Sequence, residues 1–127
     1  MLFPSSQVKI SDNSGGKLLN VIRILHKGGY GKNGKIGDIV LGSIRLLRSK
    51  NRLLSKVKKG DLVYGLIIKT RTNLKRKNGN SIKFFSNSVV LLSKTNVPLG
   101  TRIFSILPKE IRIKKFIKIL SLSPGFI

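Results

Sequence analysis

The chain has 127 residues and no cysteine, and its 26 Lys and Arg against 4 Asp and Glu give a formal net charge of +22. Without cysteine, disulfide frameworks, zinc ribbons and thiolate chemistry are excluded. Yet 40% of the residues are hydrophobic, which is enough for a core and unlike a disordered basic tail. Length and charge together predict a single domain over residues 1–127 with a polyanionic partner.

The first half of the chain reads as strands separated by turns. Val8 and Ile10 alternate with Lys9, and residues 12–16 form a strong turn signal before a strand predicted over 17–25. A glycine-rich loop over 28–37 precedes a second long strand over 39–47. A basic excursion over 48–59 follows and closes at Gly60-Asp61.

The second half continues this pattern and then changes period. Residues 62–68 form a short apolar run, which predicts a strand buried on both faces. Asn78-Gly79 between two strand-like stretches is the best hairpin signal in the chain, and residues 89–92 suit a further strand. After residue 100, Pro108 suits a first helical turn, and 116–122 fits a short amphipathic helix. We predict a mainly β fold, a small barrel of mostly antiparallel strands with one or two short C-terminal helices.

Residues 29–35 match two nucleotide-binding patterns, G-x-G-x-x-G and G-x-x-x-x-G-K. Both motifs work by placing phosphate at a helix N-terminus, whereas the residues after this loop have strand composition. Position 36 is Ile, where the second pattern needs Ser or Thr for magnesium. A nucleotide-dependent enzyme is therefore a remote alternative, and Lys27, Lys32 and Lys35 are expected to meet phosphate from a flexible basic loop.

Catalytic and metal chemistry find little support elsewhere. His26 is the only histidine, so it lacks a second ligand for a metal and an orienting partner for general-base work. Three of the four acids, Asp12, Asp38 and Asp61, lie beside glycines or turns, where carboxylates accept main-chain N–H bonds. We predict no catalytic residues, no metal site and no cofactor. No apolar run approaches the ~20 residues of a membrane span, and residues 1–4 are too short for a signal peptide.

The cations fall into clusters that contain almost no acid. Residues 45–59 hold seven cations and 69–83 hold six, both without an acid, and 102–118 hold six with only Glu110. A solvated surface normally mixes the two signs, so unmixed clusters favour contact with phosphate.

The aromatic residues help to define the kind of nucleic acid. Phe84, Phe85, Phe104 and Phe116 lie within apolar patterns that predict core positions. Proteins that bind single strands use exposed aromatic platforms, and no clear set is visible. Folded RNA read through its backbone and shape fits this composition better.

Three segments carry a family resemblance: 10–15 (ISDNSG), 58–61 (KKGD) and 100–104 (GTRIF). With them, residues 109–112 (KEIR), 116–119 (FIKI) and 120–124 (LSLSP) match in order and spacing, so the chain resembles the large-subunit ribosomal protein 14 family (bacterial L-14) over nearly its whole length. The resemblance implies a five-stranded β-barrel with a projecting hairpin and short C-terminal helices. It also implies a structural constituent of the large ribosomal subunit that binds large-subunit rRNA, without catalysis of its own.

The resemblance suggests a role for each basic cluster. The residues predicted to bind rRNA are Lys17, Arg23, Lys27, Lys32, Lys35, Arg45, Lys56, Lys58, Lys59, Arg71, Lys75, Arg76 and Lys77. The residues predicted to form bridges to small-subunit rRNA are Arg48, Lys50, Arg52, Lys109, Arg112, Lys114 and Lys115. A surface of Thr101, Arg102 and Lys118 corresponds to the family's docking site for a ribosome-silencing factor. Ribosomal proteins of the L-3 and L-19 type are the expected protein neighbours.

Two departures from the family pattern stand out. The stretch 48–54 is longer than the usual bacterial connection, and Phe85-Ser86 stands where the family has Asp-Gly. Lys, Asn, Ile and Leu are abundant, and because the codons for Lys, Asn, Ile and Phe are AT-rich, this composition points to an organelle genome. We therefore expect a mitochondrial ribosome and a protein made where it works, with a plastid or a bacterial cytoplasm as the alternative. The competing function is a stand-alone basic barrel that binds nucleic acid.

Overall fold

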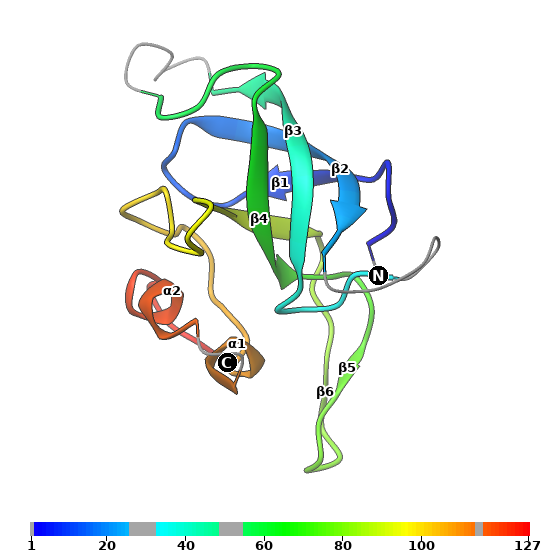
Figure 1. Cartoon of the computed structure of the whole chain (residues 1–127). Coiled ribbons are helices and arrows are strands. Elements are labelled where there is room, and N and C mark those ends of the chain that lie inside the picture. Colours follow the sequence, from blue (N-terminus) through cyan, green and yellow to red (C-terminus); the bar gives the residue numbers. More distant parts are fainter. Residues whose placement is uncertain (1, 26–32, 49–54, 114–115) are drawn as a thin grey trace.

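The computed structural model describes residues 2–25, 33–48, 55–113 and 116–127. Figure 1 shows a barrel of strands, a hairpin that projects from it and two short helices beside it. The elements in chain order are β1 (Gln7–Ile10), β2 (Gly16–Ile24), β3 (Ile39–Leu47), β4 (Leu62–Lys69), β5 (Leu74–Lys75), β6 (Ser81–Ile82), β7 (Ser88–Leu92), α1 (Glu110–Ile113) and α2 (Ile117–Ser121).

Five strands close the barrel in the order β1-β2-β3-β4-β7, which confirms the predicted fold class. The pairs β1–β2, β2–β3, β3–β4 and β4–β7 are antiparallel. The closing pair, β1–β7, is parallel, with Lys9 opposite Ser88 and Ile10 opposite Val89. The reason is topological: when five strands alternate in direction, the fifth runs the same way as the first.

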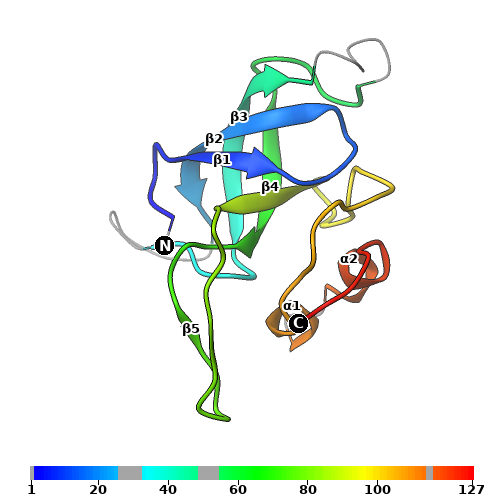
Figure 2. The same ribbon diagram turned by 180° about the vertical axis from the view of Figure 1, so that it is seen from behind.

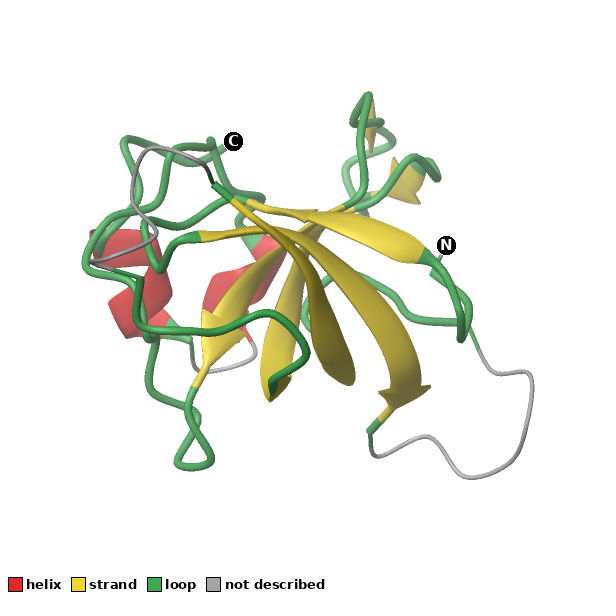
Figure 3. Cartoon of the chain, turned by 90° about the horizontal axis from the view of Figure 1, so that it is seen from above, coloured by secondary structure: helices red, strands yellow, loops and turns green. Residues whose placement is uncertain are grey.

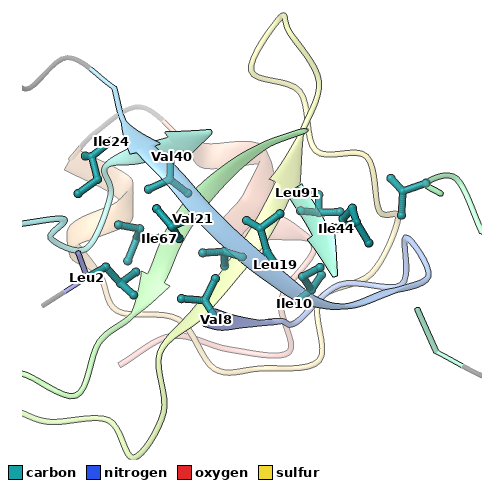
Figure 4. Packing of buried hydrophobic residues seen from close by; sticks show 12 residues of the cluster. Leu2, Val8, Ile10, Leu19, Val21, Ile24, Val40, Ile44, Ile67 and Leu91 are labelled. Atoms are coloured by element: carbon teal, nitrogen blue, oxygen red, sulfur yellow. The ribbon is translucent and has the colours of Figure 1, made fainter. Parts of the chain in front are cut away.

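The barrel interior is filled by side chains that alternate along the strands. Val8 and Ile10 of β1, Leu19 and Val21 of β2 and Val40 of β3 point inward and are almost completely buried. Figure 4 shows them meeting side chains from the opposite wall. Each side chain of this size contributes roughly 1.5–3 kcal/mol by leaving water, so the alternation determines which face of each strand lies inside.

Strand β4 is buried on both faces in its second half, as the apolar run predicted. Ile67 points into the barrel, whereas Leu66 and Ile68 point outward into a second apolar cluster. That cluster includes Leu107 and Ile111, which come from the C-terminal segment. Figure 3 shows both helices on the same side of the strands. The outer face of β4 therefore anchors the C-terminal segment to the barrel.

The two helices have four and five residues and agree with the predicted positions within a few residues. Helices this short are not stable alone in water. Ile111 of α1 and Ile119 of α2 are buried in the second cluster, and the main-chain N–H of Ile103 donates to the carbonyl oxygen of Leu122 at 3.1 Å. Packing, rather than intrinsic helix preference, therefore holds both helices in place.

Gly42 of β3 lies where β3 packs tightly against its paired neighbour β2. A Cβ atom at this position would lie 2.6 Å from the carbonyl oxygen of Asn20 and 2.8 Å from Cγ of Leu19. Because neither atom can move without disturbing the barrel, we expect Gly42→Ala to lower the free energy of unfolding by about 1–3 kcal/mol. Urea unfolding measures this, with Gly125→Ala as the control, since a Cβ there meets nothing within 4 Å. Equal losses in both variants would contradict the expectation.

Candidate nucleic-acid interface

The structure places almost all of the described cations predicted to bind rRNA at the surface. Arg76 is half-buried, and the others are exposed: Lys17, Arg23, Lys35, Arg45, Lys56, Lys58, Lys59, Arg71, Lys75 and Lys77. Of the predicted bridge residues, Lys109 and Arg112 are exposed and Arg48 is half-buried. Thr101, Arg102 and Lys118 are exposed as well. Lys27, Lys32, Lys50, Arg52, Lys114 and Lys115 lie outside the described residues.

One end of the barrel brings together residues that are far apart in the sequence. We call it the Gly100 end; it comprises residues 11–16, 48, 55–61 and 99–104. Asn13 is its centre, because its side chain accepts hydrogen bonds from the main-chain N–H groups of Thr101 at 2.8 Å and Arg102 at 3.2 Å and donates to Thr101 Oγ1 at 2.8 Å. Gly100 lies so close that a Cβ would be 2.8 Å from Asn13 Oδ1. The β1–β2 turn thus determines the conformation of the Gly100-Thr101-Arg102 segment.

Two cations reach this same end from the β3–β4 connection. Lys56 donates from Nζ to the carbonyl oxygen of Leu99 at 2.8 Å. Arg48 donates to the carbonyl oxygen of Ile10 at 3.2 Å, and its guanidinium carbon lies 5.0 Å from the centre of the Phe104 ring. A predicted bridge residue, Arg48, is therefore close to the segment that holds two residues of the predicted silencing-factor surface.

A second basic group lies on the projecting hairpin of β5 and β6, seen from behind in Figure 2. The turn at its tip is made by Asn78-Gly79, as predicted, and Gly79 has the positive φ of 80° that such a turn favours. Lys75 and Lys77 are exposed near this tip. The hairpin therefore carries positive charge away from the barrel.

Arg76 of the hairpin has a different role from its neighbours. Its Nε and a terminal nitrogen donate to the two carboxylate oxygens of Glu110 at 2.6 and 3.1 Å, and the terminal nitrogen also donates to the main-chain oxygen of Ile127 at 2.6 Å. This bidentate ion pair links the hairpin to α1. The predicted bridge set is thus divided, since Arg112 lies on the helix tied to the hairpin, Lys109 lies directly before that helix, and Arg48 lies at the Gly100 end.

A third basic group lies on the outer wall of the barrel. Lys17 and Arg23 are exposed on β2, and Arg45 is exposed on the neighbouring strand β3. The predicted cations therefore surround the barrel in several directions instead of lining one groove.

All four acids are engaged within the protein. Asp38 accepts the N–H of Lys35 at 2.7 Å and Asp61 accepts that of Lys58 at 2.8 Å, which confirms the predicted role in turns. Asp12 is fully buried and accepts hydrogen bonds from Ser14 and from the N–H of Leu91 in β7 at 2.8 Å. Glu110 is neutralised by Arg76. The exposed cations consequently face solvent with little opposing charge.

Residues 29–35 match two nucleotide-binding patterns, and the described part of this segment contributes to the packing of the fold. Gly34 exchanges two main-chain hydrogen bonds with Leu2, and a Cβ on it would lie 2.6 Å from Cδ1 of Ile67. The next regular element is strand β3, which confirms that no helix follows the loop to receive a phosphate. Residues 29–32 and His26 lie outside the described residues.

The prediction that four phenylalanines occupy core positions is wrong for two of them. Phe84 and Phe116 are half-buried against the second cluster, whereas Phe85 is 98% exposed and Phe104 is 52% exposed. The pattern itself contains the signal for Phe85: Ile82 and Phe84 are half-buried, Lys83 and Phe85 are exposed, and this is the alternation of an extended chain. The apolar character of Phe85 concealed its exposed position.

Sequence reasoning also missed the setting of Lys69. Its Nζ lies 5.4 Å from the centre of the Phe84 ring, and burial lowers the pKa of this ammonium group. Lys83, which belongs to the cluster over 69–83 but was given no individual role, is exposed, as are Lys9 and Lys94. Lys69 therefore supports the base of the hairpin, while the other three remain available to solvent.

The Arg76–Glu110 pair leads to a prediction with a defined pH dependence. Hydrogen bonding to Arg76 lowers the pKa of the Glu110 carboxyl, so the pair stabilises the fold above the ordinary carboxyl pKa and is lost as pH falls through the lowered value. We expect Glu110→Gln to increase hydrogen exchange of residues 72–83 several-fold at pH 7, with little effect on global unfolding.

The difference in hairpin hydrogen exchange between Glu110→Gln and wild type should disappear at a pH below the lowered pKa of Glu110, where the wild-type carboxyl is itself protonated. Asp61→Asn is the control, because it changes the net charge equally at the other end of the barrel. If Glu110→Gln leaves exchange of the hairpin unchanged at pH 7, the pair does not restrain it.

Within the described ranges, no helix is long and apolar enough to cross a membrane. The family model described as ribosomal protein L14p/L23e matches residues 1–127, the full length of the chain. The closed five-stranded barrel, the helices that follow it and this match agree with one another. The chain therefore belongs to the ribosomal protein L14p/L23e family of large-subunit ribosomal proteins.

Proposed function

We propose that this protein is a structural constituent of the large ribosomal subunit that binds large-subunit rRNA through several basic faces of a rigid barrel. One observation supports this most strongly: the cations are exposed around the barrel, while all four acids are engaged internally by turns, a strand or Arg76. A positive surface that is so little opposed favours a polyanion on more than one side. Family membership supports rRNA as that polyanion.

The mechanism we propose is electrostatic locking. Each exposed Lys or Arg that neutralises a phosphate releases a condensed counterion, so affinity falls steeply with salt, by about 0.7–0.9 in log–log slope for each contact. The barrel supplies rigidity, because its core and its second cluster hold the basic faces in fixed directions. The protein then acts as one domain that clamps RNA helices against each other, and we propose no catalytic role, metal or cofactor.

We propose further that two regions face the small subunit and contribute bridges to its rRNA. One comprises Arg48, Lys50 and Arg52, and the other comprises Lys109, Arg112, Lys114 and Lys115. Thr101, Arg102 and Lys118 would receive a ribosome-silencing factor, and ribosomal proteins of the L-3 and L-19 type would pack beside the barrel. The resemblance to the family supports these assignments, and the hydrogen bonds that the main-chain N–H groups of Thr101 and Arg102 donate to Asn13 are consistent with a shaped docking surface.

We propose the mitochondrial ribosome as the particle, on the basis of a composition rich in Lys, Asn and Ile, whose codons are AT-rich. Sucrose-gradient sedimentation of a lysate of purified mitochondria tests both the location and the function. The protein should migrate with the large subunit and leave it only at high salt. If it remains in the soluble fraction at low salt, a stand-alone nucleic-acid-binding barrel is the better description. If it is found on ribosomes of another compartment, only the mitochondrial assignment fails.

A further inference from the structure

Phe85 is the most exposed large apolar side chain in the described part of the protein. The residue is 98% exposed, whereas the other exposed large apolar residues range from 43% to 65%. Those side chains therefore still pack partly against the protein surface, whereas Phe85 makes almost no packing contact. Isolated apolar residues on a surface are ordinary, but an aromatic ring presented on all sides to water is a ready contact surface.

The backbone beneath this ring is held in place. Arg71 donates from Nε to the carbonyl oxygen of Phe85 at 3.1 Å, and its main-chain N–H donates to Asn87 Oδ1 at 2.9 Å. The preceding residue, Phe84, packs against the second cluster and under Lys69. The two chain segments at the base of the hairpin are thereby joined at Phe85 and at Asn87. The ring is presented from a pre-organised support, which reduces the entropy lost on binding.

The charge around the ring indicates the chemistry of its partner. Residues 69–83 contain six cations and no acid, and Arg71 and Lys83 are both exposed. Arg71 is hydrogen-bonded to the Phe85 carbonyl, and Lys83 lies two residues before Phe85 in the chain. An apolar protein surface would gain nothing from this charge and would have to desolvate it. A nucleotide uses both features, because its base stacks on a ring and its phosphate is neutralised by a cation.

We propose that Phe85 is a stacking platform for one unpaired RNA base, with Arg71 and Lys83 neutralising the adjoining phosphates. This inference rests on the proposed binding of rRNA and adds to it a contact that depends on single-stranded character. The RNA partner is then clamped by phosphate contacts and also held at one splayed nucleotide beside the hairpin.

The absence of tryptophan from the chain allows a direct test. In Phe85→Trp the only indole of the protein stands on the platform, and stacking against a base should quench its fluorescence. Titration with transcribed large-subunit rRNA from the same source should therefore quench this variant strongly. Val97→Trp is the matched control, because Val97 is exposed in the turn after β7, outside every basic cluster, and should show little quenching.

Affinity measurements on the same RNA separate stacking from charge. We expect Phe85→Ala to weaken binding about 5- to 100-fold with an unchanged salt slope, since it removes a base contact and no phosphate contact. Phe85→Tyr should bind like wild type. Lys83→Gln should instead reduce the salt slope by about 0.7–0.9. The ring is exposed, so none of the substitutions at residue 85 should disturb folding, which circular dichroism verifies.

The outcomes distinguish this inference from the function on which it rests. Wild-type affinity in Phe85→Ala or no quenching in Phe85→Trp would each overturn the platform. So would wild-type affinity in Phe85→Leu, which keeps an apolar side chain but has no ring to stack. Steep salt dependence of the wild type would still leave rRNA binding intact. If the wild type itself binds this RNA without salt dependence, the proposed function fails independently of Phe85.

Discussion

Asp12→Ala is expected to lower the free energy of unfolding by roughly 2–5 kcal/mol, the largest effect on stability among the substitutions considered, because it leaves several buried donors without an acceptor. The Asp12 side chain is fully buried and receives the N–H of Leu91 at 2.8 Å, the N–H of Ser14 at 3.1 Å and the Ser14 hydroxyl. It therefore joins the β1–β2 turn to β7 at the point where the barrel closes.

Urea unfolding followed by circular dichroism measures this loss, and Asp61→Ala is the matched control. Asp61 also accepts a main-chain N–H in a turn, but it is exposed, so water replaces the lost acceptor. We expect the control to lose about 1 kcal/mol or less. Asp12→Asn should fall between the two, because an amide retains one acceptor oxygen. A loss in Asp12→Ala no greater than in Asp61→Ala would show that the buried network adds nothing to closure.

The largest functional effect is expected from reversing two charges near the hairpin tip. Lys75→Glu with Lys77→Glu should weaken binding to large-subunit rRNA by on the order of 100-fold at 0.1 M salt and reduce the salt slope by about 1.5–2. Both side chains are exposed on the element that projects farthest from the barrel. They are also next to Arg76, whose pairing with Glu110 holds the hairpin in place.

Lys9→Glu with Lys94→Glu is the control for this experiment. It changes the net charge by the same amount, but Lys9 lies on β1 and Lys94 in the turn after β7, outside the three basic clusters. If bulk charge alone drives binding, both double variants should lose the same affinity. A clearly smaller loss in the control is expected if the hairpin makes its own phosphate contacts. Filter binding at several salt concentrations gives both quantities.

The regular elements could be predicted well because their signals are local. The bounds of β3 coincide with the predicted strand over 39–47, and Asn78-Gly79 forms the tip of the hairpin. A side-chain period of two and a turn residue that tolerates positive φ are properties of neighbouring residues, so they survive in the sequence. The alternation over 82–85 shows the limit of this reading, since the apolar character of Phe85 suggested core where the period indicated surface.

The sequence alone thus determined the barrel class, the turns, the excess of positive charge and the family to which the segment 100–104 points. Only the tertiary structure decided that Arg76 is paired with Glu110, 34 residues away, and that Asp12 holds Leu91, 79 residues away. It also decided that Arg48 lies over Phe104 and that Phe85 has no cover. Such contacts follow from barrel closure and from docking of the C-terminal segment, which bring distant residues together without leaving any periodic pattern in the chain.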